Sequence, residues 1–132
     1  MVARKIVLHL HGESFARRYQ VASHAITAAA AGDDVLVVLW FDALARWVRG
    51  TFDEPLAGED AAVAERHRAL SLPSPAAMLG EARELGVRLA ACETGVRLAG
   101  IEPEAARACV DEVPGLQELL AAARDADLAL YV

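Results

Sequence analysis

Short apolar segments that alternate with helical patterns run along the chain and predict an α/β fold. Residues 6–10 and 87–91 are short, apolar and bounded by turn formers, and residues 128–132 repeat this pattern. Residues 35–41 are apolar without alternation, which is typical of a strand buried on both faces and favours a parallel sheet. Residues 108–113, bordered by two acids and a proline, predict a weaker fourth strand.

Helical periodicity fills the intervals between these strands. After the first strand, apolar residues recur at three- and four-residue steps, with Ser14 as the expected N-cap and Gly32 as the stop, while Arg17 and Arg18 point away from the apolar face. Further helices are predicted over residues 42–49 and 59–70, up to Gly86, between Cys92 and Gly100, and from Leu116 onward. The alternation implies right-handed crossovers and a mostly parallel sheet of about five strands.

One segment departs from this alternation. Residues 50–58 hold turn formers, acids and a proline, and residues 59–70 form a charged, alanine-rich helix that contains His67. With 132 residues, of which 55% are hydrophobic, the chain is expected to form a single domain over residues 1–132. We expect the excursion at 50–72 to be a lid, an interface element or a solvated loop.

Composition disfavours several classes of function. The 19 acidic residues outnumber the 13 basic ones, for a net charge of -6, and no basic stripe is visible, so nucleic acid is not an expected partner. No apolar run reaches the length of a membrane span, so no membrane association is expected. The segment from His11 to Ser14 lacks the glycine pattern of a nucleotide loop, so nucleotide binding is not expected. Two cysteines without a Cys-x-x-Cys pair favour a reducing, cytoplasmic setting.

Cys92 is the leading candidate for chemistry. It ends the strand at 87–91 and opens a helix, so its sulfur is expected outside the carboxyl end of a strand, where open α/β sheets bind their ligands. A thiol reacts as its thiolate, which the helix dipole favours, as would Arg88 and Arg97 if they folded toward the sulfur, whereas Glu93 opposes it. The alternative is that Cys92 is a small apolar filler.

Cys109 is a weaker candidate. Neighbouring parallel strands would hold the two thiols more than about 10 Å apart. Because a disulfide needs α-carbons within about 7 Å, no Cys92–Cys109 bond is predicted.

His9 and His11 lie two residues apart at the end of the first strand, so they share one face. They could ligate a metal or act as proton donors, but two imidazoles make an incomplete metal site that would need Asp42 or Cys92 as a third ligand. We therefore expect no metal, and a supporting polar role for both histidines. Trp40 is assigned to the core or to a subunit contact.

The whole chain resembles the DsrE/DsrF-like family of sulfur-relay proteins, on motifs that recur in order along it. These are His11-Gly12 after the first strand, the alanine-rich helix to Gly32, the apolar strand to Phe41, Glu84-Leu85-Gly86-Val87 entering a strand that ends at Ala91-Cys92, Leu98-Ala99-Gly100-Ile101, and Leu116 to Ala126 followed by residues 127–132. The resemblance implies a flavodoxin-like three-layer α/β sandwich that assembles into homo-trimers or homo-hexamers, without a cofactor.

The resemblance also implies a function for Cys92. In sulfur-transferring members, a cysteine at this position accepts sulfur as a persulfide from a donor protein and hands it to an acceptor protein. The backbone amides of Thr94 and Gly95 would stabilise the persulfide, with His9, His11 and Arg97 in support. Two other functions remain open: a non-catalytic oligomeric binding module whose interface is residues 50–72, and a thiol redox sensor, which would lack a resolving cysteine nearby in sequence.

Overall fold

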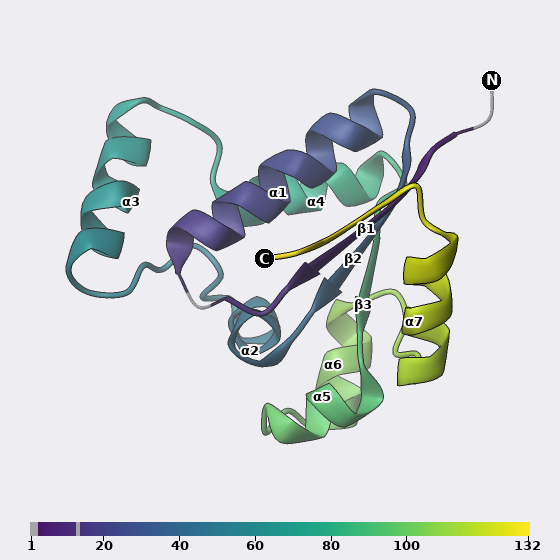
Figure 1. Cartoon of the computed structure of the whole chain (residues 1–132). Coiled ribbons are helices and arrows are strands. Elements are labelled where there is room, and N and C mark those ends of the chain that lie inside the picture. The colour runs from purple at the N-terminus through teal and green to yellow at the C-terminus, as the bar shows by residue number, and fades with distance from the viewer. Residues whose placement is uncertain (1–2, 13) are drawn as a thin grey trace.

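The protein is an α/β structure, seen in a computed structural model that describes residues 3–12 and 14–132 (Figure 1). Within these residues the chain forms four strands and seven helices. In chain order they are β1 (Lys5–Leu10), α1 (Phe15–Ala30), β2 (Asp34–Leu39), α2 (Phe41–Arg49), α3 (Glu59–Ala69), α4 (Pro75–Glu84), β3 (Arg88–Ala91), α5 (Glu93–Leu98), α6 (Pro103–Cys109), α7 (Leu116–Asp125) and β4 (Leu128–Tyr131).

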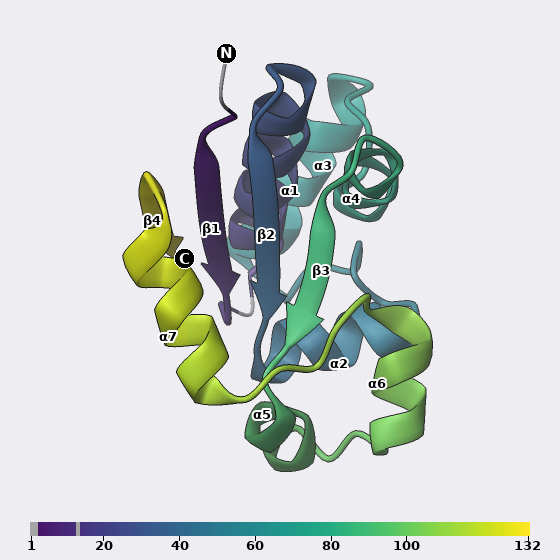
Figure 2. The same cartoon turned by 90° about the vertical axis from the view of Figure 1, so that its right-hand side faces the viewer.

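The four strands form one parallel sheet with the order β3-β2-β1-β4. Helices α1, α3 and α4 lie on one face and α7 lies on the other, while α2, α5 and α6 gather beyond the carboxyl ends of the strands (Figure 2). In the register, His9 of β1 lies opposite Val38 of β2 and Tyr131 of β4, and Leu39 lies opposite Ala91 of β3. This layered arrangement confirms the predicted flavodoxin-like fold class.

Side-chain alternation along the strands divides the core into two parts. The larger part joins one face of the sheet to α1 and α4, with Leu8, Val37 and Leu89 among its buried members. The smaller part lies under α7, where Leu119 packs against residues such as Val38. β2 contributes side chains to both parts of the core, so both of its faces are buried. This confirms the prediction from its unbroken apolar run.

The prediction of about five strands is wrong by one strand. Residues 108–113 supply the end of α6 and then a single parallel bridge, Ala90 to Glu112, beside β3. The Leu89 N–H of β3 donates to the Asp111 carboxylate at 2.7 Å. In a regular strand pair, this N–H would donate to a backbone carbonyl of the neighbouring strand. Pro114, which has no N–H, follows directly, so the ladder stops after one bridge.

The first helix confirms its predicted ends. The Ser14 hydroxyl accepts the N–H of Arg17 at 3.2 Å, and Gly32, at φ 93°, takes the left-handed conformation that stops the helix. The prediction for Arg18 is wrong, because its side chain is fully buried rather than turned outward. Its guanidinium donates to the carbonyl oxygens of Phe52 and, at 2.7 Å, of Glu54.

The excursion contains the predicted helix as α3, and polar contacts to α1 help to tie it to the sheet layers. Arg18 holds residues 52–54, as described above, and Asp60 at the start of α3 accepts the N–H groups of Phe15 at 3.0 Å and Leu56 at 2.7 Å. Burial alone would raise the pKa of Asp60, but these backbone donors, with the Arg18 charge, lower it. The excursion is therefore attached to α1 by polar contacts that are buried at Arg18 and part-buried at Asp60.

The second strand ends earlier than its apolar run. β2 stops at Leu39, and Phe41 adopts φ 45°, a left-handed conformation that a bulky residue rarely adopts. The chain turns sharply there, and α2 begins at once. Its last turn contains Trp47, whose indole donates to the Cys109 carbonyl at 2.9 Å.

The helices are short for a membrane environment. α1 has 16 residues, and a span needs about 20 predominantly apolar ones. No helix among the described residues combines the length and the apolarity that crossing a membrane requires.

Candidate functional site

The candidate site lies where the chain changes from one face of the sheet to the other. The connections from β1 to β2 and from β2 to β3 use helices on the α1 face, whereas the chain returns to β4 through α7 on the opposite face (Figure 2). The change of face follows the carboxyl end of β3, whereas the strand order reverses between β1 and β4, so the switch point at which open α/β sheets bind ligands lies at the carboxyl ends of β1 and β4, where His9 pairs with Tyr131. Trp40 and Cys92 directly follow the carboxyl ends of β2 and β3, on the same edge of the sheet.

Cys92 lies at this position, but its thiol is not open to solvent. The residue is 4% exposed and belongs to the apolar cluster under α7, together with Ala90 and Leu119. It is the N-cap of α5, and its carbonyl accepts the Val96 N–H at 2.9 Å. Cys92 therefore lies at the end of a strand, as the sequence predicts. Its burial limits which reagents can reach the thiol.

Two aromatic rings and an imidazole continue from this point across the same face of the sheet. The Trp40 indole N–H donates to Nδ1 of His9 at 2.9 Å, and the His9 ring stacks on Tyr131 with centroids 4.4 Å apart and planes 3° from parallel. Strand alternation places these side chains on the α7 face, because His9 follows Val7 by two residues. His9 is two strands from Cys92, roughly 10 Å by strand spacing, so Trp40 is the residue between them.

The hydrogen bond from Trp40 fixes the protonation of His9. An indole nitrogen can only donate, so Nδ1 must be the bare acceptor and Nε2 carries the hydrogen of the neutral ring. Burial, and to a smaller extent the nearby His11, lowers the pKa of His9. The neutral form that accepts from Trp40 is therefore the form favoured at neutral pH.

The second nitrogen of His9 is an exception to the usual pairing of buried polar atoms. Its Nε2 has no hydrogen-bond partner among the described residues, although the residue is only 4% exposed. An unpaired buried donor costs about 1–3 kcal/mol. No carboxylate among the described residues accepts a hydrogen bond from Nε2. A protonated His9 ring would therefore lack a negatively charged partner at this nitrogen.

The remaining predicted residues are divided between the site and the surface. Gly95 is buried beside Trp40 and Cys92: a β-carbon there would lie 3.3 Å from Cε3 of the indole and 3.5 Å from the Cys92 β-carbon. Thr94 is exposed, and its N–H belongs to the first turn of α5, where helices leave donors unpaired. Arg97 is also exposed and pairs with Glu93 at 3.9 Å.

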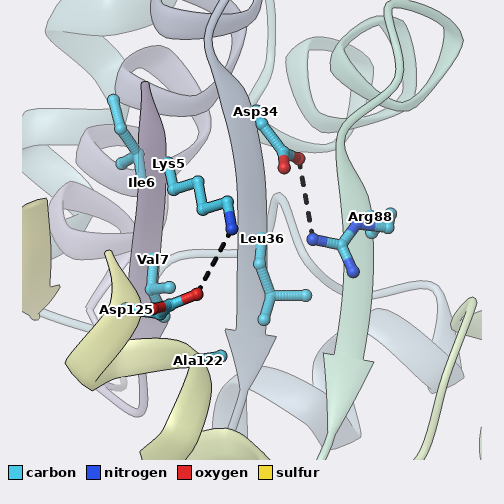
Figure 3. Close-up of a pocket in the computed structure, with 8 residues that line it drawn as sticks. All are labelled: Lys5, Ile6, Val7, Asp34, Leu36, Arg88, Ala122 and Asp125. Carbon is cyan, nitrogen blue, oxygen red and sulfur yellow. Dashed lines mark hydrogen bonds and ion pairs between the residues drawn. The ribbon is translucent and has the colours of Figure 1, made fainter. Parts of the chain in front are cut away.

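Neither arginine considered from the sequence acts on the thiol. Arg97 is engaged with Glu93, and Arg88 begins β3 at the opposite end of the sheet, where it pairs with Asp34 and Glu112, each at 3.6 Å. Figure 3 shows Arg88 with Asp34 beside a hollow of about 220 Å³ at the amino ends of the strands. That hollow, framed by charged pairs, is separate from the Cys92 region.

The predicted pair of histidines is split. His9 is buried, whereas His11 is exposed and contacts the end of the sheet through its backbone N–H, which donates to Val132 at 3.2 Å. Nδ1 of His9 is occupied by the indole. No group of three or more possible metal ligands gathers among the residues of known placement. Glu13, in the segment that carries no nucleotide motif, lies outside the described residues.

Trp40, which the sequence assigned to the core or to a subunit contact, packs half-buried against the smaller core part, and one signal also points to its place beside Cys92. Leu39 and Ala91 are register partners, so the residues that follow them, Trp40 and Cys92, end neighbouring strands at the same level. A large aromatic residue with a polar N–H group that lies beside a candidate thiol is itself a candidate site residue. Only the strand order, which the sequence leaves open, makes the two residues neighbours.

Comparison with known proteins identifies the fold. No protein-family model matches the chain, and no curated protein matches it in sequence. Among solved structures, the ychN protein from E. coli superposes with a TM-score of 0.67 at 22% identity, covering 98% of this chain and 99% of that one. A protein of unknown function from Methanobacterium thermoautotrophicum, MTH1491, superposes with a TM-score of 0.62 at 14% identity, again over 98% and 99% of the two chains.

The chain has the fold of these two proteins. The matches span nearly the full length of each chain. They agree with the flavodoxin-like α/β fold class expected from the sequence. At such identities, similarity establishes the fold and leaves the chemistry to be argued from this chain's own residues.

Proposed function

We propose that the protein is a single-thiol sulfur carrier in which Cys92 holds sulfur as a persulfide between a donor protein and an acceptor protein. The observation that carries this proposal is the position of Cys92, at the carboxyl end of β3 where the chain changes face. We also propose that residues 1–132 form one DsrE-like domain that acts as a homo-trimer or homo-hexamer in the cytoplasm, without a metal or cofactor.

The proposed transfer has two steps that each exchange one sulfur–sulfur bond. The Cys92 thiolate attacks the outer sulfur of a donor persulfide, so that a bond from Sγ to that sulfur forms, the donor S–S bond breaks and the donor leaves as a thiolate. An acceptor thiolate then attacks the same outer sulfur, and Cys92 leaves as a thiolate. One sulfane sulfur moves in each step, and no external oxidant or reductant is needed.

The surroundings of Cys92 support a role as carrier rather than as one half of a dithiol. Both cysteines are free, and Cys109 ends α6, where its carbonyl serves Trp47. The apolar contacts around Cys92 would shield a persulfide from water and from other thiols. The backbone amides of Thr94 and Gly95, in the first turn of α5, are the donors proposed to stabilise it.

A binding module is the second candidate, and the burial of Cys92 favours it. A residue that is 4% exposed fits an apolar filler as well as a stored nucleophile. In that case the exposed apolar residues within the excursion, such as Leu70 at 70% exposed, would face another subunit. If the protein were a redox sensor, an oxidant such as peroxide would instead oxidise the Cys92 thiol directly.

Intact-mass measurement after incubation with a persulfide donor separates these functions. We expect the native protein and the Cys109→Ser variant to gain the mass of one sulfur atom, and the Cys92→Ser variant to gain none. A second portion treated with peroxide tests the sensor, because a single added oxygen marks sulfenic acid.

The control is the thiol-reducing agent, which should return the loaded protein to its starting mass. If the folded native protein takes up no sulfur, the carrier proposal is wrong and the binding module is favoured. Uptake that survives in Cys92→Ser would move the site to Cys109 and would equally contradict the proposal.

A further inference from the structure

The burial of Cys92 conflicts with any reaction that a partner protein must perform on its sulfur. The thiol belongs to the cluster under α7, and the half-buried Trp40 packs against that cluster at the carboxyl edge. A β-carbon placed on Gly95 would touch both Trp40 and the Cys92 β-carbon, so the indole and the cysteine flank the same point in the first turn of α5. Trp40 is thus part of the wall between the thiol region and the edge of the sheet.

Two features hold the indole in this place. Its N–H donates to Nδ1 of His9 at 2.9 Å, and His9 is itself held by stacking on Tyr131. On its other side, the chain turns immediately after Trp40 through Phe41, at φ 45°. A non-glycine residue in this conformation is strained and persists only where the surroundings impose it.

We propose that Trp40 is a gate over Cys92, latched by its hydrogen bond to neutral His9, and that the indole must swing away before the sulfur can be reached. This inference rests on the proposed carrier function and concerns the regulation of that site. Trp40 takes no part in the bond exchange and is a positioning residue. The latch consists of one hydrogen bond between neutral groups, so it can open without unfolding the sheet.

The test measures how fast Cys92 reacts with a small disulfide reagent such as DTNB in the folded Cys109→Ser protein. Trp40→Phe keeps an aromatic ring but removes the donor, and we expect labelling about fivefold faster, the factor that one ordinary neutral hydrogen bond contributes. Trp40→Ala removes the wall itself, and we expect labelling at least about tenfold faster.

Trp47→Phe is the matched control. Trp47 is also half-buried, and its indole also donates a hydrogen bond of 2.9 Å, but to the Cys109 carbonyl rather than to His9. We expect this variant to label at the parental rate. Labelling rates are compared at several low urea concentrations, because a local opening is insensitive to urea whereas reaction through global unfolding is accelerated.

The Trp47→Phe protein supplies a second readout, since Trp40 is then its only tryptophan. Modification of Cys92 by a small methylthio reagent should shift the Trp40 emission to longer wavelength as the indole moves into water. Parental labelling rates in both Trp40 variants, or complete modification of Cys92 with unchanged Trp40 emission, would overturn the gate.

The two proposals fail in distinguishable ways. Faster labelling of the Trp40 variants in a protein that takes up no sulfur would leave the gate standing and remove the carrier function. Sulfur uptake by Cys92, together with labelling rates that do not change in the Trp40 variants, would support the carrier function and exclude the gate.

Discussion

Replacing Arg18 by methionine tests whether one buried side chain attaches the excursion at 50–72 to the rest of the fold. Arg18 is fully buried on α1, and its guanidinium donates to the carbonyl oxygens of Phe52 and Glu54. It also lies 5.9 Å from the centroid of the Phe52 ring. Methionine keeps a long, flexible and apolar side chain, so the change removes the charge and the donors with little loss of volume.

The magnitude follows from the hydrogen bonds that the guanidinium makes to the two carbonyl groups. Each hydrogen bond from a charged donor contributes about 1.5–3 kcal/mol. The carbonyl of Phe52, a residue only 2% exposed, would have no solvent to replace its donor. The Glu54 carbonyl also accepts from Arg46 at 3.0 Å and keeps that donor, so the loss of the Phe52 bond dominates and predicts a loss of about 2–3 kcal/mol in the free energy of unfolding. For a domain of this size, that corresponds to a drop in Tm of about 10 °C.

The assay is urea unfolding, with Arg17→Met as the matched control. Arg17 is the exposed neighbour of Arg18 on the same helix, so its replacement should change the free energy of unfolding by less than about 0.5 kcal/mol. Limited proteolysis under native conditions should cut residues 50–72 faster in Arg18→Met alone. If Arg18→Met proves as stable as Arg17→Met, buried polar contacts do not hold the excursion, and the reasoning fails.

Two further predictions concern the candidate site. The pKa of His9 lies below its ordinary value of 6.5 in the folded protein, so as pH falls below about 6.5 the unfolded chain gains a proton that the folded protein does not, and stability falls. In urea titrations between pH 5 and pH 7.5, His9→Gln should flatten this decline and the exposed His24→Gln should not; equal slopes in both variants would contradict it. Gly95→Ala should destabilise by about 1 kcal/mol, because crowding against the latched indole, 3.3 Å from the new β-carbon, exceeds the gain in helix propensity. Combined with Trp40→Phe, whose smaller ring is unlatched, the same substitution should become neutral or stabilising, and additive effects of the two changes would refute the contact.

Local patterns in the sequence were sufficient for most of the architecture. The N-cap at Ser14, the left-handed stop at Gly32 and the unbroken apolar run of β2 each depend on residues within a few positions of one another. The fourth predicted strand failed because a carboxylate, Asp111, takes the place of a strand carbonyl against β3. Hydrophobicity patterns do not reveal such a substitution, since they read only side-chain polarity along the segment.

The candidate site was predictable only in part, for a related reason. Position after a strand pointed to Cys92, but the burial of that residue depends on α7, which is distant in sequence. Arg18 looked solvated because arginine seldom lies in a core, and only the carbonyl groups of a segment 34 residues away make its burial favourable. Trp40 and His9 likewise meet across neighbouring strands whose order no local pattern specifies.

The latch and the thiol respond to pH in ways that constrain how the proposed carrier would open. The thiolate fraction of any cysteine grows as pH rises, so nucleophilic attack is favoured at higher pH. His9 accepts the indole N–H only while its Nδ1 is bare, so the latch too is complete at higher pH. A rise in pH therefore activates the sulfur while it keeps the gate closed. Under these conditions the proposed gate opens only when the hydrogen bond between Trp40 and His9 breaks, which is the event that the DTNB labelling rates measure, and a partner that competed for the indole N–H would favour that opening.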